Sequence, residues 1–393
     1  MSAEPATPAD PAAGLATIAR EWGRIGAVGF GGPPTHIALL RDLCVRRRGW
    51  LTAAEFEDGI AATNLLPGPA STQLAIFCAW RLGGPAGAIV GGVCFILPGL
   101  IVILALAALF LAAHPPRWVM AAAAGAAAAI PAVAAHAAAD LLPAAWRRAG
   151  TGVPARLRWA GYLAAGGVAA AVFGPWLVLV LAGCGIAEMA VRARPWPTPP
   201  KRALPPLIAA PAATAGGLLA VMGVALKVGA LSYGGGFVII PLMRHDAVDR
   251  YHWMTDTQFL DAVALGQVTP GPVVQTVAVV GYAAAGLIGG LLAAAVAFTP
   301  SFVFILLLGP RFEWLRQDRR IQAFLVGAGA GAIGAIAGTT VPLARALTEP
   351  WQFALLAAAA GWLLALRRGV VSALLGAGAA GVIAAAAGAP IPG

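Results

Sequence analysis

The sequence predicts an all-α polytopic membrane protein made of two homologous, inverted-topology repeats with broken or re-entrant helices. Composition gives the class, because 60% of the 393 residues are hydrophobic, only 11% are charged and the mean hydropathy is +0.82. A soluble chain of this length needs far more polar surface, whereas long apolar runs with few charges are typical of membrane spans. The repeats are indicated by the tripeptide Pro67-Gly68-Pro69, which recurs as Pro270-Gly271-Pro272 in equally apolar surroundings.

The two Pro-Gly-Pro tripeptides lie 203 residues apart, and the same offset aligns the residues around them. About a third of the positions between Gly26 and Gly87 are identical to their partners, more than shared composition gives. The matched residues include Gly31 and Gly32 with Gly234 and Gly235, Arg41 with Arg244, Trp50 with Trp253, Asp58 with Asp261, and Gly87 with Gly290. We therefore expect a disordered tail (1–14), a first repeat (15–191), a Pro-rich cytoplasmic linker (192–205) and a second repeat (206–393).

In the first repeat, helices are expected on both sides of each break. Residues 15–40 have a helical pattern that Gly-Phe-Gly-Gly-Pro-Pro interrupts at 29–34. Residues 52–64 predict a short helix with Thr52 as N-cap and Glu55 three residues on, which is the spacing of a capping box. The Pro-Gly-Pro ends this helix, and residues 70–81 predict another. Two short helices beside a break form either a re-entrant hairpin or one discontinuous span.

Longer apolar segments predict the membrane spans. In the first repeat these are residues 85–113, 118–142, 159–173 and 176–191. The second repeat has the same order, with a helix at 207–231, a break at 232–241, short helices at 255–268 and 273–285, and spans at 286–308, 321–344, 351–366 and 370–387.

Loop charge indicates how the two repeats are oriented. Arginines cluster in the loops at 147–158 and 192–202, which two spans separate, so both loops are expected in the cytoplasm. The second repeat is basic at 311–320, where the equivalent loop of the first repeat, 114–117, has one arginine. Equivalent loops with opposite bias are expected of inverted repeats. The net charge of +10 then reflects cytoplasmic loops beside anionic lipid, and not nucleic-acid binding.

Broken helices in inverted repeats are where secondary transporters bind their substrates. Here the breaks offer glycine backbone N–H groups and helix N-termini, which favour anions. Arg24 and Lys227 stand at matched positions, each two residues before a glycine. A cation inside an apolar segment costs about 2.5–3.5 kcal/mol on insertion scales, so such a residue usually has a function. These features predict a dianion site that needs no metal; the alternative is that both cations extend to the membrane interface.

The predicted binding residues combine these cations with the residues of the breaks. They are Arg24, Lys227, Gly31, Gly32, Gly234, Gly235, Asn64, Gly68, Gln267 and Gly271. For the amides Asn64 and Gln267, hydrogen bonds in helix packing are the alternative role. Asp58, Asp261 and His36 are candidates for proton coupling, with capping or packing as their alternative. No catalytic residue, metal or cofactor is expected.

Four motifs in order give the sequence a family resemblance. Phe-Gly-Gly-Pro-x-x-His at 30–36 and Leu-Pro-Gly-Pro at 66–69 are echoed by Ser-Tyr-Gly-Gly-Gly at 232–236 and Thr-Pro-Gly-Pro at 269–272. This set resembles the chromate ion transporter family in its long, two-domain form. The resemblance implies a multi-pass protein of the bacterial inner membrane that exports chromate and confers chromate resistance. It also implies sulfate as a related oxyanion, and the proton gradient or membrane potential as the energy source, as in an antiporter.

Three other functions are alternatives to chromate export. The first is transport of sulfate or another oxyanion, and the second is a passive anion channel. The third is a membrane-embedded lipid pyrophosphate phosphatase, which needs a Ser/Arg/His cluster at the break. The sequence disfavours this enzyme because no arginine follows the first Pro-Gly-Pro until Arg81. The sequence leaves the oligomeric state open, a homodimer included.

Overall fold

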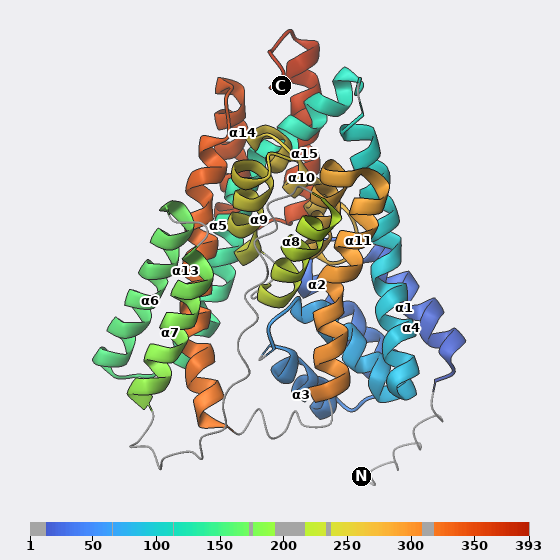
Figure 1. Ribbon diagram of the computed structural model, residues 1–393, viewed down its shortest axis with the longest axis vertical. Helices are drawn as coiled ribbons and strands as arrows, with labels where there is room; N and C mark the ends of the chain where they lie inside the picture. The colour runs from blue at the N-terminus through green and yellow to red at the C-terminus, as the bar shows by residue number, and fades with distance from the viewer. Residues whose placement is uncertain are drawn as a thin grey trace.

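The computed structural model describes residues 13–64, 66–112, 114–172, 176–192, 217–232, 237–308 and 318–392. Every regular element in these ranges is a helix (Figure 1). The first half contains α1 (Leu15–Val28), α2 (Pro33–Arg41), η1 (Asp42–Arg47), α3 (Ala53–Thr63), α4 (Ala70–Phe110), α5 (Arg117–Ala149), α6 (Val153–Val172) and α7 (Leu177–Arg192). The second half contains α8 (Leu218–Leu231), η3 (Phe237–Ile239), α9 (Ile240–Arg244), η4 (His245–Arg250), α10 (Asp256–Val268), η5 (Val273–Gln275), α11 (Thr276–Leu308), α13 (Arg319–Arg345), α14 (Pro350–Ala360), η7 (Gly361–Ala365) and α15 (Val370–Ala386).

Four of the described helices are long and apolar enough to cross a membrane, namely α4, α5, α11 together with η5, and α13. Three shorter apolar helices accompany them: α8, α14 with η7, and α15. The predicted class of all-α polytopic membrane protein is thereby confirmed. Most of the predicted tail (1–12), the linker beyond Arg192, and the second glycine break with Gly234 and Gly235 lie outside the described residues.

The two halves build the same local geometry at matched positions. Thr52 and Thr255 each close a capping box at the start of α3 and α10, as the sequence predicts for the first. The π-helical turns η1 and η4 also stand 203 residues apart. They are followed by Gly49 and His252, both with positive φ, at 59° and 52°. Both halves therefore turn the backbone in the same way after the π-helical turn, and the second half does so without a glycine.

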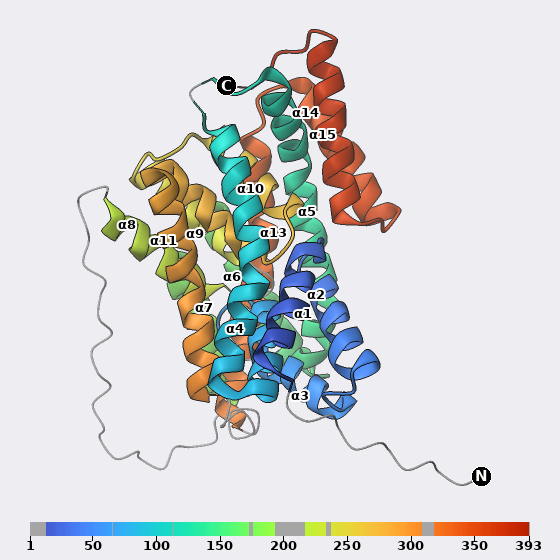
Figure 2. The same cartoon turned by 90° about the vertical axis from the view of Figure 1, so that its right-hand side faces the viewer.

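Each half also contains a helical hairpin. In α4 the backbone leaves the helical conformation at Gly83 and Gly84, and in α11 it does so at Ala285 and Gly286. The short arm that follows each Pro-Gly-Pro thus folds back on a long arm. This hairpin lies beyond the two short helices for which a re-entrant hairpin or a discontinuous span was predicted, and the choice between those two stays open. Figure 2 shows the long arm of α4 running from the lower to the upper end, while that of α11 runs the opposite way.

The register between the halves shifts by one residue beyond the Pro-Gly-Pro. The turn residues Gly84 and Gly286 are 202 residues apart, where the gapless alignment expects 203. Gly87 and Gly289 both pack closely on a carbonyl of their own short arm, so Gly289, not Gly290, is the partner of Gly87. The physical reason is that the second short arm begins with the 3₁₀ turn η5, which rises about 2.0 Å per residue against about 1.5 Å in an α-helix. Fewer residues then cover the same length.

Helices of the two halves exchange partners. α5 of the first half packs against α14 and α15, whereas α13 of the second half packs against α6 and α7. α4 and α11 pack against each other, and α5 and α13 also pack against each other directly. Small residues permit the close approach: a Cβ on Gly166 would lie 1.9 Å from the carbonyl oxygen of Gly331. The interleaved halves thus bring both Pro-Gly-Pro breaks to the centre of one body.

Candidate functional site

Two backbone hydrogen bonds join the breaks of the two halves. The N–H of Gly68 donates to the carbonyl oxygen of Ser232 at 2.6 Å, and the N–H of Gly271 donates to that of Gly29 at 3.0 Å. The two donors, like the two acceptors, are related by the repeat offset. Both donor glycines have positive φ, 125° and 94°, which favours glycine over other residues. Each Pro-Gly-Pro therefore binds the opening break of the other half.

These two hydrogen bonds occupy N–H groups that were predicted to bind an anion. Gly68 and Gly271 both donate within the protein, so neither N–H faces a ligand in this structure. The helix that follows Gly31 and Gly32 begins with two prolines, Pro33 and Pro34 of α2, which have no N–H. Gly68 and Gly271 therefore shape the backbone in this structure, and their N–H groups are not available to an anion. Anion binding by the other glycines of the breaks stays a prediction, and Gly234 and Gly235 lie outside the described residues.

His36 links the first glycine break to the start of α4. Its ring is buried, with Nε2 2.9 Å from the carbonyl oxygen of Gly29 and Nδ1 3.2 Å from Oγ of Ser71. The Phe95 ring meets it edge-on at 5.0 Å between centroids. Because a carbonyl oxygen only accepts, Nε2 carries a hydrogen, and in the neutral ring Nδ1 accepts from the Ser71 hydroxyl. This environment supports the packing alternative, and a role of His36 in proton coupling stays a prediction.

The matched cations Arg24 and Lys227 are both ion-paired away from the breaks. The half-exposed Arg24 lies beside Glu21 on its own helix, with 3.5 Å between Nε and Oε2. Lys227 binds the buried Asp246, with 2.5 Å between Nζ and Oδ2. Asp246 belongs to η4, so this ion pair links α8 to the π-helical turn η4. Neither cation lines the cavity beside the first break.

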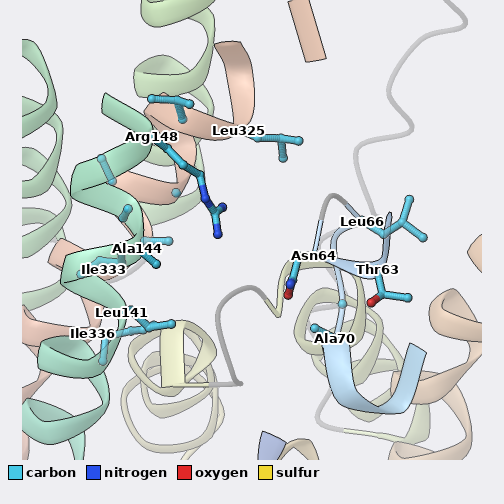
Figure 3. A pocket seen from close by; sticks show the side chains of 16 residues that line it. Thr63, Asn64, Leu66, Ala70, Leu141, Ala144, Arg148, Leu325, Ile333 and Ile336 are labelled. Atoms are coloured by element: carbon cyan, nitrogen blue, oxygen red, sulfur yellow. The ribbon is translucent and has the colours of Figure 1, made fainter. Parts of the chain in front are cut away.

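A cavity of about 170 Å³ lies beside the first Pro-Gly-Pro (Figure 3). Its walls are the end of α3, the start of α4, and faces of α5 and α13, with mostly apolar or small side chains. Its polar side chains are Thr63, Asn64 and Arg148, and the Thr63 hydroxyl donates to the carbonyl oxygen of Gly59 at 2.9 Å. Arg148 and Asn64 extend into the cavity from opposite walls (Figure 3). The cavity thus joins two predicted residues, Asn64 and Gly68, to a cation.

Arg148 is the residue that the sequence prediction missed. Counting it among loop charges was wrong, because α5 continues to Ala149 and does not end near residue 142. Leu141, Ala144, Ala145 and Arg148 form one helical face, at i, i+3, i+4 and i+7, and all four line the cavity. This spacing was the available signal. Among the described residues, no ion pair involves Arg148.

The cavity has donors for an anion and no acid in its lining. Besides Arg148 and Asn64, it is lined by Ala70, the first residue of α4 after the N-cap Pro69. The first N–H groups of a helix have no partner within the helix and carry partial positive charge. A guanidinium, an amide and a helix N-terminus therefore meet in one cavity, a combination that suits an oxyanion.

The second break has the same sequence pattern but is closed. Gln267, the counterpart of Asn64, is 8% exposed, and its Nε2 has no hydrogen-bond partner within the described ranges. Gly99 packs so tightly here that a Cβ on it would lie 2.1 Å from the carbonyl oxygen of Pro270. The matched acids differ in the same way, because Asp58 on α3 is exposed whereas Asp261 on α10 is 5% exposed.

Comparison with known proteins identifies the family. The family model described as chromate transporter matches residues 16–189 and 219–382. A chromate transport protein of Cupriavidus metallidurans is 33% identical over 82% of this chain and 80% of its own length. A chromate transport protein of Pseudomonas aeruginosa is 31% identical over 83% and 80%, and a probable chromate transport protein of Synechococcus elongatus is 30% identical over 85% and 86%. No solved structure matches. The resemblance carried by the four motifs is thereby confirmed, and the chain belongs to the chromate transporter family.

Proposed function

We propose that this protein exports chromate by alternating access and binds the dianion in the cavity beside the first Pro-Gly-Pro. The observation that carries the proposal is the cavity lining, in which the Arg148 guanidinium, the Asn64 amide and the start of α4 surround a space without acids. Relatives that span most of the chain are named chromate transport proteins, which favours chromate among oxyanions. Sulfate is a second substrate to test, because it too is a tetrahedral dianion with only acceptor oxygens.

The distribution of basic residues supports an orientation that suits export. The end of α5, the start of α6, the end of α7 and the start of α13 lie at the lower end of Figure 1. Arg158 and Arg192 both bind Glu188 there, and Arg192 also donates to the carbonyl oxygen of Ala149. The positive-inside rule assigns this end to the cytoplasm. The Arg148 cavity is then the cytoplasmic entrance.

Alternating access is supported by the contrast between matched positions. The first Pro-Gly-Pro borders a cavity while the second is packed shut, and the long arms of α4 and α11 run in opposite directions. If the halves are inverted repeats, exchanging their conformations closes the inner break and opens the outer one. Gln267 and Gly271 would then face the substrate from the outer side.

The membrane potential alone is sufficient to drive the reaction in this scheme. Moving one charge through 100 mV is worth about 2.3 kcal/mol, so expelling a dianion from a negative interior gains about 4.6 kcal/mol at that potential. Export against a roughly thousandfold gradient requires about 4.1 kcal/mol. Proton coupling is therefore an addition to this mechanism, and chromate resistance is its expected consequence in the cell.

The experiment is chromate uptake by energised everted membrane vesicles. Arg148→Gln is expected to lower the initial rate at least tenfold, since a hydrogen bond to a charged group is worth about 1.5–3 kcal/mol. Arg147→Gln is the matched control, because Arg147 neighbours Arg148 on α5 but does not line the cavity. Uptake should saturate with chromate, be reduced by sulfate if both bind, and fail when the potential is collapsed.

Normal uptake by a fully expressed Arg148→Gln variant would reject this cavity as the binding site. Flux that rises without saturation would instead indicate an anion channel. Uptake that survives loss of the potential but not of the pH gradient would make proton exchange the energy source.

A further inference from the structure

A second cavity, of about 250 Å³, lies at the opposite end of the molecule from the Arg148 cavity. Its walls come from the end of α4, the segment that joins it to α5, the start of α5, one side of α10, and Pro392. Thr257 and Gln258 of α10 are half-exposed at this cavity, while Asp261, one turn further along the helix, is buried. The cavity thus leads from the surface to a buried carboxyl group.

No ion pair joins Asp261 to another residue of the described ranges. Its Oδ1 makes no hydrogen bond within the described part of the chain, and no other titratable side chain lines the cavity. Of the helices packed on α10, α15 has no titratable residue and α11 has only Tyr282. α4, α5, α9 and η4 also pack on α10, and none of their charged side chains lines this cavity. Arg117 at the start of α5 is exposed, and Asp256 at the start of α10 binds Arg244. A buried, unpaired carboxylate is very costly, so this environment favours the protonated form of the Asp261 carboxyl.

The equivalent acid of the first half is in the opposite situation. Asp58 occupies the same position on α3 as Asp261 does on α10, but it is exposed. In the proposed alternating cycle α10 becomes exposed when α3 is closed, and Asp261 would then meet water. An exposed aspartate is ionised at neutral pH. Closing the outer end therefore requires the uptake of one proton from the outer side.

We propose that Asp261 is a proton-binding site that must be loaded from the outer aqueous phase before the outer end of the transporter can close. This inference rests on the proposed alternating access. On closing, a proton from outside water binds a carboxylate oxygen of Asp261, and on opening it returns to the same side. The site thus links outer pH to conformation: acidity outside favours the form with the open cytoplasmic cavity.

The test measures conformation without any anion. Spin labels at Ala112→Cys and Thr257→Cys, on the two walls of the cavity, report its width in protein reconstituted in lipid nanodiscs after the native cysteines are replaced. Asp58→Asn is included in the background, so that the matched acid cannot take up a proton in the alternative form. We expect the ratio of closed to open molecules to fall about tenfold per pH unit between roughly pH 5 and 8.

Asp261→Asn is expected to make this ratio independent of pH and to favour the closed form, because the amide needs no proton. Asp261→Glu should restore the pH dependence, which shows that the asparagine variant has not merely misfolded. A slope that persists in Asp261→Asn, or a flat ratio in the Asp58→Asn background, overturns the proton site. Neither result affects the Arg148 transport assay. A single unchanging distance at every pH would overturn both the proton site and alternating access.

Discussion

The two Pro-Gly-Pro breaks have the same residues and equivalent hydrogen bonds, yet only the first borders the Arg148 cavity. Asn64 is exposed at the first break, and its counterpart Gln267 is buried at the second. The difference lies in the packing around the breaks. The long arm near the first break contributes Ser301, whereas at the second the equivalent position is Gly99, which lets the backbones touch. Sequence identity at a repeat therefore does not imply equal accessibility.

The largest effect is expected from Gly99→Ala. A Cβ at this position would lie 2.1 Å from the carbonyl oxygen of Pro270, a backbone atom that cannot rotate away. We expect a loss of about 3 kcal/mol or more in the free energy of unfolding, measured by thermal denaturation in detergent.

Ser301→Ala is the matched control at the first break. The Ser301 hydroxyl is buried without a partner in the described chain, so its removal should change stability by less than about 1 kcal/mol. Equal losses in the two variants would mean that the second break is no more tightly packed than the first.

The matched cations provide the second comparison. Lys227→Met leaves Asp246, which is 1% exposed, with only the more distant Arg250 at 4.0 Å among its described ion pairs. We expect destabilisation of about 2 kcal/mol, below the range for fully buried pairs because Lys227 is 35% exposed. Arg24→Met removes a half-exposed arginine and leaves Glu21 its pairs with Arg20 and Arg48, so it should cost less than about 1 kcal/mol. A larger loss of stability with Arg24→Met would contradict the ion pairs described here.

Chemical labelling tests accessibility at the breaks directly. Asn64→Cys should react with a membrane-impermeant maleimide in everted vesicles about tenfold faster than Gln267→Cys, since the exposed side chain needs no opening of the protein. The native cysteines are replaced in both variants. Equal rates would show that the two breaks are equally open in the membrane, and chromate should slow the reaction at Asn64→Cys if it occupies the cavity.

The smallest effects are expected where the halves do not differ. Thr52→Ala and Thr255→Ala each remove a capping box at the start of α3 or α10. Both should lower stability by about 1 kcal/mol, again measured by thermal denaturation. A clear inequality would show that one of the two short helices depends more strongly on its cap than its surroundings suggest.

The sequence predicted most of the backbone because helix-breaking residues act locally. Pro-Gly-Pro, the first glycine break and the capping box at Thr52 all have the predicted positions, since each depends on residues close in the chain. The one-residue shift in register was not predictable in this way, because it arises from the 3₁₀ turn that begins the second short arm.

The candidate site was predicted only in part, because side-chain partners come from distant segments. Asn64 and Gly68 do line the cavity, but Arg24 and Lys227 are engaged by Glu21 and Asp246. No local pattern reveals that the Gly68 N–H already has an acceptor in the other half. Arg148 was missed for a simpler reason, since the end of α5 was placed several residues too early.

The reciprocal bonds between Gly68 and Ser232 and between Gly271 and Gly29 also bear on how the protein is made. When the first half leaves the ribosome, the N–H of Gly68 has no acceptor, because Ser232 has not yet been synthesised. Unpaired backbone groups in lipid cost several kcal/mol each, so the first half alone is an incomplete membrane protein. The hairpin of α4 should adopt its final conformation only when the second half inserts into the membrane. Each half thus provides a hydrogen-bond acceptor that the other half needs, so the two halves should fold together during insertion.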